Sequence, residues 1–191
     1  MTVMMPDLRP LTISDEKFWE LCAANPELRL ERTAEGEVIF MPPAFSDTGS
    51  RNLDIGAQLW IWNQRTGLGK AFDSSAGFTL PNGAIRSPDA AWIRKERWDA
   101  LTRQEQSRFA FICPDFVVEL RSLSDRLADI QDKMAEYLEN GAQMGWLIDP
   151  QEEQVYIYRP GHAVEVLNVP DIVSGDPILP GFILKMGDIF S

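Results

Sequence analysis

The sequence predicts an α/β fold, in which a mixed β-sheet is flanked by helices. Apolar runs of strand length alternate with segments of helical periodicity along the chain. In residues 114–149 a helical pattern lies between two apolar runs, which is typical of a helix that crosses over a sheet to join two strands. No internal repeat or long linker divides the 191 residues, so a single domain is expected.

The first segments are expected to form a short helix and a hairpin. Residues 1–13 are predicted to be a loose arm that precedes one domain over residues 14–191. Ser14 is a suitable N-cap for a helix that ends near Pro26. "LRLERT" and "VIFMP" are typical strand sequences, and "AEGE" between them is typical of a turn.

A longer helix follows, for which Asp47 or Thr48 is the expected N-cap. Ile55, Leu59 and Trp62 recur at the spacing that places side chains on one helix face, so this face is expected to be buried. Short strands are then expected in "KAFD", "GFTL" and "DAAWI", with a turn at "PNG".

Residues 94–113 are polar and irregular, with one helical turn expected in "KERWDAL". After them, "DFVVEL" predicts a strand, and the next helix is expected to start at its N-cap Ser124 and to end before Gly141. "MGWLID" and "QVYIY" predict a hairpin, "AVEVLNV" predicts an edge strand, and the apolar residues of "LPGFILKMGDIF" are expected to pack on the body.

Composition and charge exclude several classes of protein. The formal net charge of -11 argues against binding of nucleic acid by the whole surface, and it indicates that a cation has to supply positive charge at any phosphate site. His162 is the only histidine, and Cys22 and Cys113 lack metal-ligand spacing, which argues against a zinc site or a His-dependent triad. Neither a signal peptide nor an apolar membrane span is found, so a cytoplasmic protein without membrane contact is expected.

Two carboxylates occur in apolar strands. Asp89 opens one strand and Glu119 lies near the end of another, so antiparallel pairing would bring the two carboxylates together. Burying two anions requires compensation by a basic residue or a divalent cation.

Lys133 is the basic candidate. The chain advances roughly 16 Å from Glu119 to the expected helix start, at about 3.3 Å per residue. It returns roughly 13 Å along the helix to Lys133, at about 1.5 Å per residue.

An Asp, a Glu and a Lys grouped in this way can hydrolyse phosphodiesters. Mg²⁺ or Mn²⁺ takes carboxylate ligands and activates water, and a lysine can orient that water or stabilise charge on phosphorus. Each residue alone has a simpler structural explanation: Asp89 as a turn cap, Glu119 as an ion-pair partner of Arg121 or Lys133, and Lys133 as a solvated side chain. The expected convergence of three such residues at one height favours a catalytic site.

The sequence resembles the Uma2 family, within the PD-(D/E)XK nuclease-like superfamily. The resemblance covers nearly the whole chain and is carried by "EGEVIFMPP", "SPDAAWI", "PDFVVELRS", "DKMAEYLENGAQMGWLIDP" and "VYIYRP" in this order and spacing. It implies a restriction-endonuclease-like fold, a mixed sheet flanked by helices, with a divalent-metal site for DNA cleavage.

The resemblance also implies roles for individual residues. Asp89 and Glu119 would be metal ligands, and Glu31 matches an acidic position of the family's first strand that reaches the metal directly or through water. The superfamily's lysine often lies two residues after the glutamate, where this chain has Arg121. In Uma2-like proteins the lysine is moved to the next helix, which fits Lys133.

The leading prediction is therefore a Mg²⁺- or Mn²⁺-dependent endonuclease that hydrolyses DNA, with Asp89, Glu119 and Lys133 as catalytic residues. Arg121 and Gln131, beside Lys133 on its helix, are predicted to contact the substrate. A homodimer would suit cleavage of two strands. The alternatives are a non-catalytic binding or assembly module, which the acidic surface favours, and a hydrolase of another phosphoester. DNA binding further requires that basic residues gather near the cleft, with these candidates: Arg51, Arg86, Arg94, Lys95 and Arg121.

Overall fold

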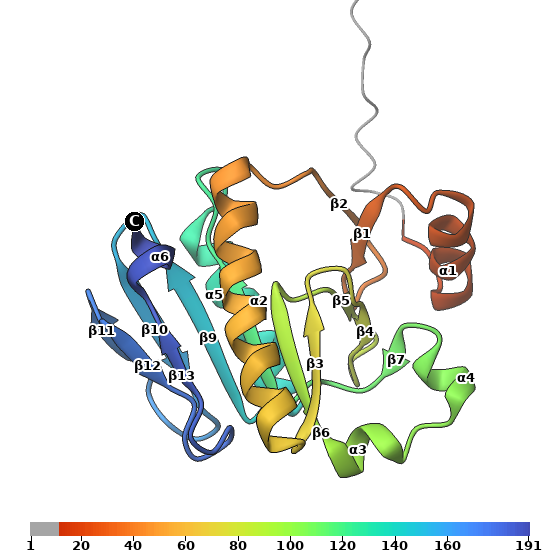
Figure 1. Cartoon of the computed structure of the whole chain (residues 1–191). Helices are drawn as coiled ribbons and strands as arrows, with labels where there is room; N and C mark the ends of the chain where they lie inside the picture. Colours follow the sequence, from red (N-terminus) through yellow and green to blue (C-terminus); the bar gives the residue numbers. More distant parts are fainter. Residues whose placement is uncertain (1–11) are drawn as a thin grey trace, which may run out of the picture.

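The computed structural model describes residues 12–191, which form helices packed on β-sheets (Figure 1). The helices are α1 (Asp15–Ala24), α2 (Ser46–Thr66), α3 (Lys95–Asp99), α4 (Arg103–Gln106), α5 (Leu127–Glu139) and α6 (Gly187–Phe190). The first strands are β1 (Arg29–Arg32), β2 (Val38–Met41), β3 (Gly69–Asp73), β4 (Phe78–Thr79), β5 (Ile85–Arg86), β6 (Ala90–Arg94) and β7 (Ala110–Phe111). The later strands are β8 (Phe116–Leu120), β9 (Met144–Asp149), β10 (Gln154–Tyr158), β11 (Glu165–Asn168), β12 (Ile172–Ser174) and β13 (Ile183–Lys185).

The main sheet has six strands in the order β11-β10-β9-β8-β6-β3. Strands β8 and β9 are parallel, and every other neighbouring pair is antiparallel. Helix α5 supplies the crossover between β8 and β9, as parallel strands require. The predicted mixed sheet with flanking helices is therefore confirmed.

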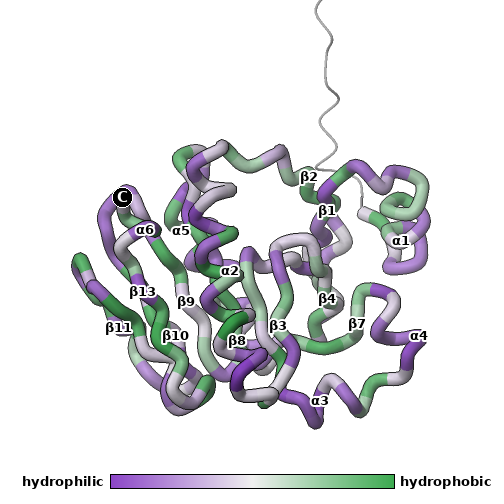
Figure 2. Tube along the Cα trace, in the orientation of Figure 1, coloured by the Kyte–Doolittle hydropathy of each residue, from purple (hydrophilic) through white to green (hydrophobic). Residues whose placement is uncertain are grey.

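Both faces of the main sheet are covered, which explains why β8 and β9 are apolar and buried along their whole length. Ile55, Leu59 and Trp62 of α2 pack on one face, together with apolar residues of the C-terminal segment. Met134 and Tyr137 of α5 pack on the other. Figure 2 shows hydrophobic residues along β8 and β10, whereas α3 and α4 are mainly hydrophilic.

A second sheet of five short strands has the order β2-β1-β5-β4-β7. Phe78 of β4 packs on Ala91 and Ile93 of β6. Ala91 pairs with Val117 of β8, which packs under α5, so this sheet and α5 cover the same face of the main sheet. The two elements lie next to each other there and can form the walls of a cleft.

Helix α2 differs from its prediction at its start. Its N-cap is Phe45, whose side chain makes no capping hydrogen bond, and the helix starts at Ser46. The prediction that Asp47 or Thr48 is the cap was wrong, because both residues already lie in the first helical turn. The helix therefore starts without the usual polar cap.

Helix α5 also starts later than expected. Its N-cap is Arg126 rather than Ser124. The cause is a local turn, in which Asp125 Oδ2 accepts hydrogen bonds from the Ser122 backbone N–H at 2.8 Å and from Ser122 Oγ at 2.6 Å. This competing side-chain hydrogen bonding delays the helix.

The N-terminal helix is confirmed, with Ser14 as the cap that accepts a hydrogen bond from the Lys17 backbone N–H. Before it, Thr12 forms a β-bridge with Glu37, and the Ile13 N–H donates to the Gly36 carbonyl at 2.9 Å. The rest of the predicted arm, residues 1–11, lies outside the described residues. No helix in the described part of the chain has the length and apolar character needed to cross a membrane.

Candidate active site

A cleft of about 1020 Å³ opens between the second sheet, the start of α2 and helix α5. Its lining includes all four acidic and basic side chains that were singled out as metal ligands or catalytic residues: Glu31, Asp89, Glu119 and Lys133. The structure thus gathers these four residues from elements that are far apart in the sequence.

Asp89 and Glu119 face each other across two paired strands. Strands β6 and β8 are antiparallel, and Ala90 pairs with Val118, so Asp89 and Glu119 occupy the next position of the ladder. The Leu120 backbone N–H donates to Asp89 Oδ2 at 2.8 Å. The predicted antiparallel pairing is confirmed, and it places both carboxylates on the face that α5 covers.

Lys133 reaches Glu119 from α5. Its Nζ lies 2.9 Å from Glu119 Oε1 and 2.9 Å from Glu31 Oε1. One turn later, the buried Tyr137 hydroxyl donates to Glu119 Oε1 at 3.0 Å. One oxygen of Glu119 therefore takes two hydrogen bonds, while no described residue donates to Oε2.

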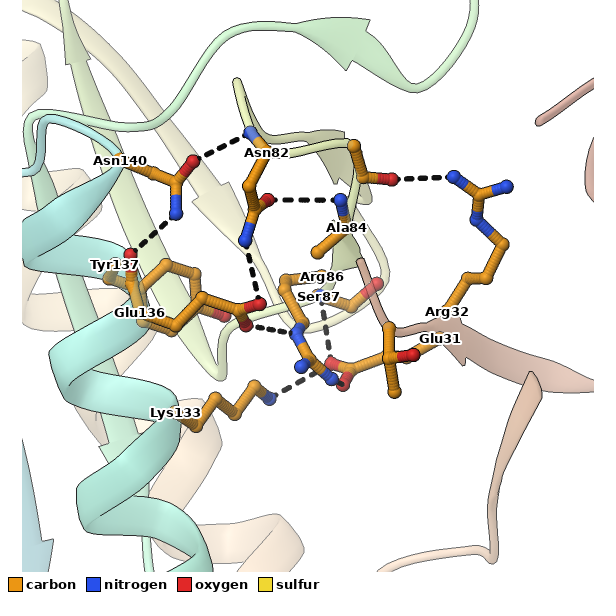
Figure 3. A network of polar contacts seen from close by, with 12 residues as sticks. Glu31, Arg32, Asn82, Ala84, Arg86, Ser87, Lys133, Glu136, Tyr137 and Asn140 are labelled. Atoms are coloured by element: carbon orange, nitrogen blue, oxygen red, sulfur yellow. Dashed lines mark hydrogen bonds and ion pairs between the residues drawn. The ribbon is translucent and has the colours of Figure 1, made fainter. Parts of the chain in front are cut away.

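Glu31 comes from β1 of the second sheet, and both of its carboxylate oxygens accept hydrogen bonds (Figure 3). Its Oε1 accepts from Lys133 and from the Ser87 backbone N–H, both at 2.9 Å, and its Oε2 accepts from Arg86 Nη1 at 3.2 Å. Arg86 in turn donates through Nε to Glu136 Oε2 at 2.6 Å. Glu31 thus connects the second sheet to α5 through cations.

The two carboxylates of the pair hold their protons more tightly than usual. Burial raises the pKa of Glu119 to about 7, and the nearby charges of Asp89 and Glu31 add to this effect, although Lys133 opposes it. Burial also raises the pKa of Asp89, against the stabilising hydrogen bond from the Leu120 N–H. The described groups therefore do not fully compensate the negative charge of this pair.

Lys133 and Glu31 form the complementary ion pair. Burial favours the neutral amine of Lys133, but the carboxylates of Glu119 and Glu31 outweigh it and raise its pKa. Burial likewise opposes ionisation of Glu31, but Lys133 and then Arg86 lower its pKa. Lys133 is therefore an ammonium near neutral pH, and it cannot accept a proton from water.

The donor set around Asp89 fits a hard divalent cation. Asn52 of α2 donates through Nδ2 to Asp89 Oδ1 at 2.8 Å, and its own buried Oδ1 has no hydrogen-bond partner among the described residues. A carboxylate pair beside an unpartnered amide oxygen offers the oxygen ligands that Mg²⁺ prefers. Over residues 12–191, no cluster of three or more His, Cys, Asp or Glu side chains is arranged to hold a metal.

Arg121 and Gln131, which were predicted to contact the substrate, lie outside the lining of the cleft. Arg121 Nη1 donates to Asp149 Oδ2 at 2.7 Å, because the chain turns after β8 and directs this side chain to the end of β9. Gln131 is two residues from Lys133 on α5, about 200° around the helix. Neither residue lines the cleft.

The gathering of basic residues that DNA binding requires is not found in the described part of the chain. Of the five candidates only Arg86 lines the cleft, and carboxylates hold its guanidinium. Arg94 and Lys95 lie at the far end of β6, beside Asp115 and Asp99. This scatter weakens the assignment of DNA as the substrate, and it leaves the metal-site hypothesis unaffected.

Sequence reasoning also missed three contributors to the site: Asn52, Arg86 in its role as partner of Glu31, and Tyr137 in its hydrogen bond to Glu119. Tyr137 carried a usable signal, because it lies one turn after Lys133 on the same face of the helix. The position of Asn52 depends on how α2 lies over the sheet, and no local pattern reveals that.

The chain is similar to known proteins in sequence and in fold. Residues 15–187 match the Uma2 family, which is described as "Putative restriction endonuclease". The crystal structure of a "putative nuclease belonging to DUF820" from Anabaena variabilis is similar in fold, with a TM-score of 0.72 and 25% sequence identity. The similarity covers 86% of this chain and 90% of the other. No curated protein matches the chain significantly.

Proposed function

The chain belongs to the Uma2 family of restriction-endonuclease-like proteins, and on this premise we propose that it is a metal-dependent endonuclease that hydrolyses DNA phosphodiester bonds. One observation carries the proposal. Asp89 and Glu119 face each other on paired strands at the bottom of a cleft, and the Lys133 ammonium lies 2.9 Å from Glu119.

In the proposed site, Asp89 and Glu119 hold Mg²⁺ or Mn²⁺, with the Asn52 amide oxygen as a further ligand. The bound cation supplies polarisation of the phosphoryl oxygen and lowers the pKa of water. Glu119 Oε2 and Asn52 Oδ1 accept no hydrogen bond from any described residue, so both oxygens are free to bind a cation, which supports this assignment. One or two carboxylates are the usual protein contribution to a magnesium site.

Lys133 acts as a fixed cation in this proposal. Because its pKa is raised, it donates hydrogen bonds to a phosphate oxygen or to the attacking water and stabilises the negative charge that develops there. Glu31 has its oxygens engaged by Lys133, Arg86 and the Ser87 N–H, so we assign it to positioning Lys133 rather than to direct metal binding.

The proposal is tested by incubating the protein with supercoiled plasmid and with labelled single- and double-stranded oligonucleotides, in Mg²⁺, Mn²⁺ or EDTA. Cleavage should require the divalent cation and should disappear in Glu119→Gln and Asp89→Asn. The matched control is Glu35→Gln, which removes an exposed carboxylate on the β1–β2 turn. Mn²⁺ titration followed by electron paramagnetic resonance should show binding in the control but not in the two site variants.

A non-catalytic binding module remains the competing function, because the basic candidates do not gather at the cleft. A folded wild-type protein that neither binds Mn²⁺ nor cleaves any of these substrates would favour that module. Light scattering on the same preparation measures the molar mass and tests the expected homodimer.

A further inference from the structure

The cleft is poor in charges that attract phosphate. Among the residues that the structure describes, three basic and seven acidic side chains line it. Lys133 and Arg86 are bound to carboxylates, and Arg29 donates to the Ser74 carbonyl. Non-specific binding of duplex DNA depends on basic groups that replace counterions along the phosphate backbone. The cleft therefore has to obtain its affinity for nucleic acid from another source.

Exposed apolar side chains at the mouth of the cleft can supply this affinity for nucleic acid. Leu28, Met41 and Phe45 line the cleft, with exposed fractions of 41%, 39% and 55%. Pro42 and Pro43 stand between Met41 and Phe45, and their fixed φ angles restrict the connection that carries Phe45 into α2. An aromatic ring is thus held at the mouth on a segment of reduced freedom.

Phe45 also departs from the local rules of helix formation. It occupies the N-cap of α2, where Ser, Thr, Asp or Asn would hydrogen bond the free backbone N–H groups, and its side chain makes no such bond. Phe45 is exposed by more than half as a residue, so core packing does not explain its presence. An exposed aromatic residue that replaces a polar cap at the edge of a cleft is suited to contact a ligand.

We propose that the cleft takes an unpaired nucleic acid strand, whose bases stack on Phe45 and on the neighbouring apolar side chains while its phosphate reaches Asp89 and Glu119. This inference rests on the proposed function, because it assigns the substrate of the same site. Bases of a single strand expose their faces to an aromatic side chain, and such stacking is a major source of sequence-independent affinity. Base pairs within a duplex hide these faces from Phe45.

The test measures binding by fluorescence anisotropy, using a fluorescein-labelled 12-nucleotide oligo(dT) and a labelled blunt duplex of the same length. Ca²⁺ is present as a divalent cation that takes the same oxygen ligands. The single strand should bind more tightly than the duplex. Phe45→Ala should weaken its binding by about fivefold or more, the lower range for one base–aromatic stack, and Phe45→Trp should retain it.

Phe111→Ala is the matched control, because Phe111 is 62% exposed on β7 and does not line the cleft. Equal affinity for duplex and single strand, equal effects of the two alanine variants, or no binding of either probe would overturn the inference. The cleavage assay keeps the two proposals apart. Cation-dependent cleavage of duplex that Phe45→Ala leaves unchanged refutes the assigned substrate alone, whereas Phe45-dependent binding without cleavage refutes the catalytic proposal alone.

Discussion

Replacing Glu119 with Gln should stabilise the protein increasingly as the pH rises, while it removes a proposed metal ligand. Glu119 is buried, and its pKa is raised to about 7 by burial and then by the charges of Asp89 and Glu31. Gln has nearly the same volume and keeps an oxygen that accepts from Tyr137 and Lys133, but it never ionises. The substitution therefore isolates the free-energy cost of the buried negative charge.

The size of the effect follows from the two protonation equilibria of Glu119. Its pKa is about 7 in the folded protein, compared with an ordinary value of 4.5. Between these values the folded state binds more protons than the unfolded state. The contribution of Glu119 to the free energy of unfolding is therefore fully present below pH 4.5 and is lost as the pH rises through 7. At about 1.4 kcal/mol for each pH unit, the loss in the wild type is at most about 3–4 kcal/mol.

Urea unfolding at several values between pH 5 and pH 8, followed by tryptophan fluorescence, measures this difference. The stability of Glu119→Gln relative to wild type should rise by about 2–3 kcal/mol across this range. The exposed control Glu35→Gln should show no such trend. A stability difference between Glu119→Gln and wild type that stays constant with pH would show that the buried charge is compensated, contrary to the reasoning given for this site.

Three further substitutions test the site and the sheet. Lys133→Met removes the cation that two buried carboxylates share, so it should lower stability by about 3–5 kcal/mol at pH 8 and by less at pH 5, as measured by urea unfolding. Asp89→Asn should abolish Mn²⁺ binding, as measured by electron paramagnetic resonance, while the near-ultraviolet circular dichroism spectrum stays native. Gly69→Ala should lower stability by about 1–3 kcal/mol, because the added Cβ would overlap the Ile93 carbonyl. Its control Gly56→Ala, on open helix surface, should be neutral or stabilising in the same unfolding assay.

The convergence of Asp89, Glu119 and Lys133 was predictable because it depends on short-range geometry. Alternation along β8 determines the face to which Glu119 points, and antiparallel pairing with β6 determines its partner. The rise of α5 returns Lys133 to the height of Glu119, and the observed separation of their charged atoms is 2.9 Å.

The second sheet was only partly predictable. The β1–β2 hairpin has a local signature, but β4, β5 and β7 have two residues each, which is too short for any periodicity to show. Their pairing depends on long-range contacts, such as that of Arg32 with Ile85. Because this sheet brings Arg86 and the Ser87 N–H to Glu31, the engagement of the Glu31 oxygens could not be inferred from the sequence.

Two departures from ordinary folding rules lie at the cleft. A carboxylate lies in the fully buried strand β8, and Phe45 replaces a polar cap. Elsewhere α1 has the polar cap Ser14, whereas α5 also starts without a side-chain cap. Natural proteins tend to violate local rules where function requires it. Substitutions that restore the rules at Glu119 and Phe45 should therefore gain stability and lose ligand binding together, whereas a purely structural origin of these departures would leave binding unchanged.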